Sequence, residues 1–513
     1  MSELLLCAPV RVALSVCLTC SLTLSYRALS ATPASVNVTN TLTIERRGDN
    51  QNLNTQDDDY SIGFNRFNFG GQAYGVGFGG RLDSVGLLDP PTEAYQDDWI
   101  RIERLNLSYE LGSVQLEAGD LYQQLGRGQL LALRKVDELG LDIALRGGRV
   151  SYSDRHNALK AFGGVANVVN LDSVSQCFVE DAHDLITGGY YERRTPGGNL
   201  GVMYVYMTPE QQQYEGLSLP DATSSGGLYY EAPGLTEWLG LYVELDAQQR
   251  RAIERLSSGY AGYLTLDLHH EDTTLMVEGV WLDDFEQRGS QNSALKSRFN
   301  YNQAPTLERI DQEIAELYDV WGGRVRAQQD FWEGDLSFHV NALYKLNRAG
   351  DPLELKQYHL YGGAETYYDL GSSRLSMSGG HRFDEQATRT VRTWSHGELD
   401  WVHAFGSGYS SHLTTQYQRI RVEDAPAFLR GSSIVGLERS GLGGLSFELG
   451  TDTQNPNARQ LFYAGILRWD LSSWLLLQSV VGSQRGGIKC VAGVCRDFPS
   501  FSGVRLQLIG RYR

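Results

Sequence analysis

The feature that most constrains this sequence is a period-two alternation of apolar and polar residues, which recurs from one end of the chain to the other. In residues 105–111, the apolar side chains of Leu and Tyr occupy every second position, and Asn106, Ser108 and Glu110 lie between them. The same alternation is present in residues 36–45, 264–269, 335–346 and 504–513. Because successive side chains of a β-strand point to opposite faces, the pattern predicts many strands with one apolar and one polar face.

The composition agrees with an all-β chain and excludes several other classes. The 57 Gly, 28 Tyr and 9 Trp against only 13 Pro suit strands and tight turns, whereas a disordered chain would be poor in aromatic residues. The mean hydropathy is −0.33, and no apolar run beyond the N-terminus is long enough for a transmembrane helix, which excludes a helical membrane bundle. The formal net charge of −17 argues against nucleic-acid binding.

The N-terminus has the layout of a secretory signal. Arg11 precedes a mostly apolar stretch, residues 12–24, and small residues follow around Ala28 and Ala34. We therefore expect a signal peptide over residues 1–31 and a single domain over 32–513.

Three cysteines remain after the expected signal, and they agree with an exported protein. Four residues separate Cys490 from Cys495 in the stretch KCVAGVC, which favours a small disulfide-closed loop in an oxidising compartment. A metal-binding pair is less favoured because no His or second Cys pair lies nearby in the sequence. Cys177 has no assigned role. We expect neither a metal site nor a cofactor.

Two architectures fit strands with charged polar faces: a two-sheet sandwich, and a membrane barrel whose apolar face meets lipid and whose polar face lines a lumen. The connections favour the barrel, because short Gly-containing turns alternate with long polar loops. The expected turns are at 70–71, 112–113, 197–198, 333–334, 371–372 and 406–408. The expected loops are 47–57, 83–98, 165–186, 209–225, 283–318, 422–427 and 485–499.

The number of strands must be even if both ends of the barrel sheet lie on the same side of the membrane. Counting 226–232 and 428–437 as short strands gives 24 strands, within an expected range of about 20–24. Trp residues are expected in two interfacial bands. The band near the loops would contain Trp99, Trp281, Trp321 and Trp394, and the band near the turns Trp238, Trp332, Trp469 and Trp474.

Acidic residues concentrate in the expected loops, which accounts for the net charge. They are Asp49, Asp57, Asp58, Asp59, Asp97, Asp98, Glu180, Asp181, Asp184, Asp283 and Asp284. Solvated carboxylates are the simpler interpretation, and divalent-cation bridging to lipopolysaccharide is the alternative.

With these features the sequence resembles a bacterial outer-membrane β-barrel. Its last strand resembles the assembly signal of that class, although Tyr512 is penultimate and Arg513 ends the chain. Residues 119–147, with the elements GDLY, LGRG, ELGLD and LRG, are similar to a segment of uncharacterised porin-like proteins. The resemblance implies a Gram-negative outer-membrane location, contact with outer-membrane lipids and lipopolysaccharide, and insertion by the barrel-assembly machinery. It identifies no solute and no periplasmic or oligomeric partner.

Residues 120–149 are the candidate functional segment, because charged residues surround an irregular Gly-rich stretch. The candidates are Asp120, Arg127, Arg134, Lys135, Glu138, Asp142, Arg146 and Arg149. A loop folded into the lumen would pair such residues with wall charges, narrow the pore and set its charge selectivity. The alternative, which we slightly prefer from the sequence, is an extracellular loop with solvated charges.

Two further motifs carry weaker signals. Residues 75–80, GVGFGG, match a dinucleotide-binding pattern, but they lie in an expected strand over 71–82 with no helix after it, so strand glycines are favoured. Residues 306–318, TLERIDQEIAELY, predict a short helix that rests on the barrel rim or docks a partner.

The sequence therefore predicts an all-β, transmembrane, antiparallel up-and-down β-barrel. A barrel this wide cannot be filled by its own wall side chains, so passive diffusion of small polar solutes is the favoured function. Alternatives are an export or assembly conduit, a structural barrel with periplasmic partners, and, less favoured, a soluble exported carbohydrate-binding β protein. No catalytic constellation is recognisable, and we do not expect an enzyme.

Overall fold

The computed structural model describes residues 34–52, 58–89, 99–171, 179–210, 213–214, 217–218, 222–252, 255–292, 297–308, 319–348, 354–386, 389–491 and 494–512. The expected signal peptide (1–31), Cys177 and most of the expected helix (309–318) lie outside these ranges. Within the ranges, no helix has the length and apolar character needed to cross a membrane.

One antiparallel sheet forms the wall of the molecule. Its strands are β1 (Ser35–Arg47), β2 (Ser61–Ala73), β3 (Val76–Leu88), β4 (Trp99–Leu111), β5 (Val114–Leu121), β9 (Leu141–Ser153), β10 (Asn157–Val168), β11 (Leu185–Thr195), β12 (Gly198–Thr208), β15 (Ala222–Thr236), β16 (Leu239–Ala252), β17 (Arg255–His270), β18 (Thr273–Asp283), β21 (Val320–Phe331), β22 (Leu336–Asn347), β23 (Leu355–Tyr368), β24 (Ser373–Gln386), β25 (Arg389–Phe405), β26 (Tyr409–Val422), β27 (Phe428–Arg439), β28 (Gly443–Asp452), β29 (Leu461–Ser472), β30 (Leu475–Gln484) and β33 (Phe501–Tyr512). The same sheet also includes β8 (Lys135–Val136), which pairs with β9 but does not belong to the wall. Of the 25 strands of the sheet, 24 therefore form the wall.

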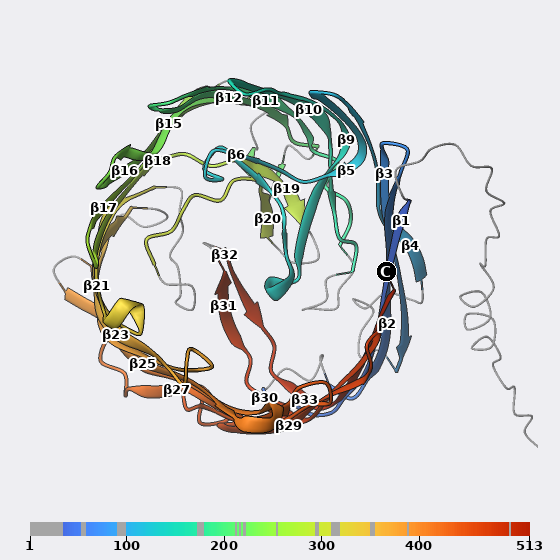
Figure 1. Ribbon diagram of the computed structural model, residues 1–513, viewed down its shortest axis with the longest axis vertical. Helices are drawn as coiled ribbons and strands as arrows, with labels where there is room; N and C mark the ends of the chain where they lie inside the picture. The colour runs from blue at the N-terminus through green and yellow to red at the C-terminus, as the bar shows by residue number, and fades with distance from the viewer. Residues whose placement is uncertain are drawn as a thin grey trace, which may run out of the picture.

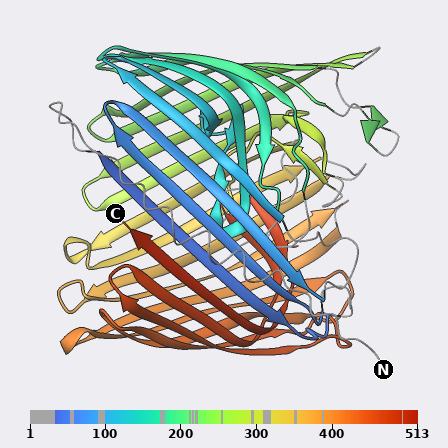
Figure 2. The same ribbon diagram turned by 90° about the vertical axis from the view of Figure 1, so that its right-hand side faces the viewer.

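The wall closes into a barrel because its first and last strands pair. β1 pairs with β2 on one side and with β33 on the other, where Val38 is opposite Tyr512 and Thr41 is opposite Ile509. Each remaining wall strand pairs with its neighbours in the chain, which gives an up-and-down ring (Figure 1) of obliquely running strands (Figure 2). Closure leaves no sheet edge unpaired, as a barrel in lipid requires. The predicted all-β barrel is confirmed.

The connections alternate as expected. The strands meet in tight turns at one end of the barrel, for example at 112–113 and 406–408, and most connections at the other end are long, for example 122–140, 169–184, 284–319 and 485–500. The short strands predicted at 226–232 and 428–437 are confirmed within β15 and β27.

The turn predicted at 70–71 is wrong, because both glycines lie inside β2. The chain turns instead at Tyr74 and Gly75, whose φ angles are 54° and 78°. This turn also divides the single strand that was expected over residues 71–82. The remaining glycines of the GVGFGG motif then open β3, with no helix after them, so they are strand glycines as predicted.

The outer face of the wall is a continuous apolar surface. On β4, Leu105, Leu107 and Leu111 are exposed on the face predicted to meet lipid, and Phe338 and Val340 are exposed likewise on β22. Exposed apolar surface around a closed barrel is stable only against a hydrocarbon environment. This is the architecture of an outer-membrane barrel.

Aromatic residues form bands at both ends of this surface. At the turn end, Trp238, Trp332, Trp469 and Trp474 are exposed. At the loop end, Trp281 and Trp321 are exposed, and the ring of Trp281 stacks on Tyr260 with the ring centroids 6.5 Å apart. Trp394 does not belong to the loop-end band: its side chain is buried, and the guanidinium carbon of Arg382 lies 5.2 Å from its ring centroid.

In the part of the chain that the structure describes, segments of three loops fold into the barrel and occupy part of the lumen (Figure 1). The first lumen loop, residues 122–140, contains the hairpin β6 (Gln123–Leu125) and β7 (Leu131–Leu133) and the short helix η2 (Asp137–Leu139). The second, residues 284–319, contains β19 (Arg288–Asn292) and β20 (Ser297–Asn300). The third, residues 485–500, contains β31 (Gly487–Val491) and β32 (Val494–Phe498).

The first two lumen loops bring a hydrophobic core into the lumen. Leu125, Leu130, Leu131 and Leu133 of the first loop are almost completely buried, and Tyr301 of the second loop packs in the same cluster. Their partners on the wall include Phe162, Ile186, Met203, Val205, Met207 and Leu343. Each fully buried leucine contributes roughly 1.5–3 kcal/mol, so the loops are packed elements rather than loose insertions.

The two faces of β4 allow a direct test of the barrel's orientation in lipid. Leu107→Lys places a charge on the apolar outer face and should destabilise the barrel by about 2–4 kcal/mol if the residue lies near the bilayer midplane. The measurement is urea unfolding of the protein folded in lipid vesicles. Asn106→Lys, on the lumen face next to it, is the matched control and should change stability little. Equal effects of the two substitutions would contradict the assignment of Leu107 to the lipid face and of Asn106 to the lumen face.

Candidate constriction site

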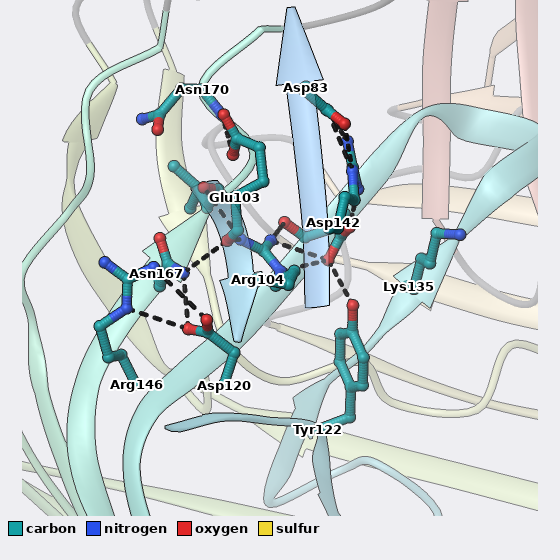
Figure 3. Close-up of polar contacts among 12 residues, drawn as sticks. Asp83, Glu103, Arg104, Asp120, Tyr122, Lys135, Asp142, Arg146, Asn167 and Asn170 are labelled. Carbon is teal, nitrogen blue, oxygen red and sulfur yellow. Dashed lines mark hydrogen bonds and ion pairs between the residues drawn. The ribbon is translucent and has the colours of Figure 1, made fainter. Parts of the chain in front are cut away.

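The first lumen loop is fixed to the wall where it leaves β5. The carboxylate of Asp120 accepts hydrogen bonds from Arg146 Nε at 3.1 Å, from Asn167 Nδ2 at 2.7 Å and from the backbone N–H of Leu105 at 2.7 Å. These partners lie on β9, β10 and β4, so one carboxylate ties together four neighbouring strands (Figure 3). Asp120 and Arg146, both predicted from the sequence, are thus in direct contact.

The loop is fixed a second time where it returns to the wall at β9. Asp142 accepts hydrogen bonds from Arg81 at 2.6 Å, from Arg104 at 2.8 Å and from the hydroxyl of Tyr122 at 2.8 Å (Figure 3). Arg81 also bonds Asp83, with its Nε 2.8 Å from Oδ1. Because both arginines and Asp142 are buried, each charge depends on its partners.

The tip of the first lumen loop reaches another part of the wall. The backbone N–H of Arg127 donates to Glu244 at 2.9 Å, its guanidinium lies 3.4 Å from Glu231, and the guanidinium carbon lies 4.2 Å from the ring centroid of Tyr242. Gln129 Nε2 donates to Asp246 at 2.7 Å. The loop therefore links β5 and β9 to β15 and β16 through the lumen, and the solvated alternative preferred from the sequence is wrong.

The three lumen loops contact one another. Between the first and second loops, the N–H of Ala132 donates to the carbonyl of Tyr301 at 2.7 Å, and the N–H of Gln303 donates to the carbonyl of Gly128 at 2.7 Å. Between the third and the first, Arg496 donates to the carbonyl of Leu139 at 3.0 Å. These bonds join the loops into one body within the lumen.

Asp184, one of the acidic loop residues, holds the second lumen loop. Its carboxylate is fully buried and accepts hydrogen bonds from the hydroxyl of Tyr301 at 2.7 Å and from the N–H of Ser290 at 2.8 Å. Burial, together with the negative charge of Asp184, raises the pKa of Tyr301 well above its ordinary value. Neither interpretation of this residue from the sequence, solvation or cation bridging, is correct.

Glu308 holds the far end of the described second loop. Its carboxylate lies 3.6 Å from Lys345 Nζ, 3.6 Å from His359 Nδ1 and 3.5 Å from Arg382, and all four side chains are buried. Burial alone would raise the pKa of Glu308, but the charge of Lys345 and the nearby His359 and Arg382 lower it to about 2. The carboxylate is therefore ionised at neutral pH.

A cavity of about 630 Å³ remains between the first two loops and the wall. Arg127 and Arg134 line it from the first loop, Gln303 and Glu308 from the second, and residues of β17, β21, β22 and β23 from the wall. Burial lowers the pKa of Arg134. This cavity is large enough to hold a small molecule, whereas the charged groups of the cluster around Asp142 are buried against one another.

The structure thus divides the predicted constriction residues into three groups. Asp120, Asp142 and Arg146 belong to the wall cluster that fixes the loop, while Arg127 and Arg134 line the cavity. Lys135 points away from the cluster (Figure 3) and pairs with Asp137 at 2.7 Å, and Glu138 is exposed. Arg149, predicted with this group, bonds Glu117 and the carbonyl of Tyr122 on the wall side.

The sequence did not reveal the structural roles of Asp184 and Glu308, and it did not identify the wall residues of the cavity. One signal for the inward loops was present in residues 198–208, which are apolar on both faces. On β12, Leu200, Val202 and Tyr204 face outward, whereas Met203, Val205 and Met207 face inward and are buried beneath the loops. A wall strand with two apolar faces marks a covered section of lumen.

The two cysteines of the third lumen loop lie opposite each other. Cys490 on β31 is the register partner of Cys495 on β32. Directly opposite positions suit a disulfide, and the bond itself stays a prediction.

Comparison with known proteins finds similarity in structure only. No family model matches the sequence, and the search of curated proteins finds no match. Among solved structures, the chain is similar to OccK2 (OpdF) of Pseudomonas aeruginosa, solved in complex with glucuronate, with 14% identity, a TM-score of 0.40, and coverage of 71% of this chain and 96% of the other.

Two further structures give the same result. The outer membrane protein OpdK of Pseudomonas aeruginosa is 15% identical, with a TM-score of 0.38 and coverage of 70% and 95% of the two chains. A BenF-like porin from Pseudomonas fluorescens Pf-5 is 12% identical, with a TM-score of 0.39 and coverage of 74% and 98%. Similarity at this level carries over neither a solute nor a site.

The cluster around Asp142 predicts a large loss of stability when its carboxylate is removed. Asp142→Ala leaves Arg81 and Arg104 buried without their shared partner, which should cost about 3–5 kcal/mol and release the base of the first lumen loop. Urea unfolding and proteolysis at residues 122–140 measure the two effects. Glu138→Ala, in the same loop but exposed, is the control and should change neither. A stable, protected Asp142→Ala barrel would contradict this role.

The lowered pKa of Glu308 predicts how the second lumen loop responds to acid. Its stabilising contribution is complete above the carboxyl pKa of the unfolded chain, about 4.3, and is lost only as the pH falls through about 2. Hydrogen exchange of residues 299–308, corrected for intrinsic rates, should stay slow at pH 4 and accelerate near pH 2. Glu308→Gln should accelerate it at pH 7, and Glu333→Gln, at an exposed turn, should not. Acceleration of the wild type already near pH 4.5 would show that the carboxylate is not held as described.

Proposed function

We propose that this protein is a porin-like channel of the outer membrane, in which three lumen loops restrict passive diffusion to small polar solutes. The observation that carries the proposal is the cavity of about 630 Å³, which remains inside a closed 24-strand barrel after the loops have folded into it. Transport through it is diffusion, governed by size and by the charges of the lumen, and it involves no covalent step.

The polarity of the cavity supports a path for water-soluble molecules. Its lining includes four arginines, Glu308, Gln124, Gln303 and Asn341, in contrast to the apolar outer face of the barrel. The packed loops argue against a wide conduit for exported macromolecules, because such a path would require the hydrophobic core within the lumen to leave the wall.

The partners follow from the location and are proposed with it. The apolar belt would contact outer-membrane lipids, the loop end would face lipopolysaccharide, and the barrel-assembly machinery would insert the chain. The register between β1 and β33 supports the last of these, because the two strands must meet to close the barrel. No oligomeric or periplasmic partner is proposed.

Single-channel recording in planar bilayers tests the function. The wild-type protein should give a small, stable conductance, because the loops occupy much of the lumen. Replacing residues 123–133 by a short Gly-Ser linker removes the β6–β7 hairpin and should raise the conductance severalfold. A Gly-Ser replacement of residues 454–457, which are exposed in the connection between β28 and β29, is the control and should leave the conductance unchanged. If neither the wild type nor the hairpin deletion conducts, the channel proposal is wrong.

A further inference from the structure

Two adjacent strands form part of the wall side of the cavity, and one presents arginine side chains to it while the other presents an asparagine amide. Arg324 and Arg326 lie two positions apart on β21, so both point to the lumen face, and Asn341 lies on β22. Arg326 and Asn341 are direct register partners. Opposite residues of an antiparallel pair have Cβ atoms about 5 Å apart, so one bound group can contact both side chains.

The charges around the cavity are not balanced. Arg324 is paired with Glu278, its Nε 2.6 Å from Oε2, and Arg127 is 3.4 Å from Glu231. Arg326, in contrast, donates a hydrogen bond to the neutral amide oxygen of Gln328 at 2.9 Å. Among the described lining residues, Glu308 is the one acidic side chain, and it is already surrounded by Lys345 and Arg382. The field in the cavity is therefore positive on the side of β21.

Asn341 supplies an independent sign of a ligand. Its side chain is 1% exposed, and its Oδ1 accepts no hydrogen bond from any part of the protein that the structure describes. A buried amide oxygen without a donor is unfavourable by about 1–3 kcal/mol, and such groups are rare in folded proteins. Because Asn341 lines the cavity, a hydroxyl or N–H group of a solute held there would satisfy this oxygen.

The size and the remaining lining fit a compact organic molecule. A volume of about 630 Å³ lies within the range of roughly 300–1,000 Å³ that is common for small-molecule sites. Tyr361 and His339 present rings at the same wall, with centroids 6.5 Å apart and an interplanar angle of 75°. These rings give the site apolar surface beside its charged and hydrogen-bonding groups.

We propose that this cavity is a binding subsite for a small hydroxylated organic anion, with Arg326 contacting the anionic group and Asn341 Oδ1 accepting a hydrogen bond from a hydroxyl. The proposal rests on the proposed channel function and specifies its solute class. Arg134 and Arg324 add positive charge around the anion, and Gln303 closes the site from the second lumen loop.

Gluconate is a suitable probe, because two analogues each remove one of its recognised features. Sorbitol has the hydroxyl groups without the charge, and propionate has the charge without the hydroxyl groups. Binding to the full-length barrel folded in detergent is measured by calorimetry, and blockade of single channels by the same three compounds is measured separately. Gluconate should bind more tightly than either analogue.

Two substitutions separate the roles of the wall residues. Arg326→Gln should weaken gluconate and propionate binding about tenfold, as expected for loss of one charge-assisted contact, and should leave sorbitol unchanged. Asn341→Ala should reduce the advantage of gluconate over propionate. Arg326→Lys keeps the charge and should recover part of the affinity. Arg468→Gln, which removes the same charge from an exposed position on β29, should have no effect. Heat-modifiable gel mobility verifies folding of each variant.

The outcomes distinguish the subsite from the channel. Conductance without selective gluconate binding, or equal effects of Arg326→Gln and Arg468→Gln, would overturn the subsite and leave the channel proposal intact. Selective binding without conductance would support the subsite and overturn the channel.

Discussion

Pairing of β1 with β33 is the interaction on which the rest of the structure depends. In lipid an unpaired backbone N–H or C=O has no water to bond, so a sheet can span the membrane only when it has no edge. Once the sheet closes, the period-two alternation determines the environment of each side chain, because one set must face hydrocarbon and the other must face the lumen. The long apolar runs of a helical membrane protein are then unnecessary, which reconciles a mean hydropathy of −0.33 with an exposed apolar surface.

Closure of 24 strands has a second consequence, because the enclosed space is too wide for wall side chains to fill. The first two lumen loops bring leucines and Tyr301 inward, and Met203, Val205 and Met207 of β12 pack against them. The rule that the inner face of a membrane barrel is polar therefore fails on this part of the wall. The exception is physical, since the covered inner face is a protein core and no longer a water-filled surface.

These two consequences explain how much of the molecule could be predicted from the sequence. The strands and most connections are properties of short segments, and the alternation over 105–111 is visible without knowledge of the rest of the chain. The even number of strands follows instead from the requirement that both ends of the sheet lie on the same side of the membrane. The contacts that fold the loops inward join distant residues, such as Asp184 with Tyr301 and Glu308 with Arg382, and no local pattern pairs them. The candidate segment 120–149 was identified by its charges, but charge alone could not separate Asp142, which fixes the loop, from Arg127, which lines the cavity, or from Glu138, which is exposed. Trp394 was misplaced for the same reason, because a strand position does not reveal that Arg382 lies beneath the ring.

The lumen loops are held by apolar packing and by polar contacts, and the balance between the two differs around the wall. Toward β9–β18 a dense apolar core packs beside the polar contacts of Asp142 and Arg127, and separating this core would expose leucines and aromatic rings to water. Toward β21–β24 the described second loop is held by the ion cluster of Glu308 with Lys345 and Arg382, and the cavity lies beside this cluster. Ionic groups regain hydration when they separate, so the net cost of parting them is smaller than their close contact suggests, whereas apolar groups gain no such compensation. Under the proposed channel function, a solute would therefore pass at lowest cost along β21–β23, where the wall presents arginines and Asn341. The apolar core would keep the loops in place during this passage.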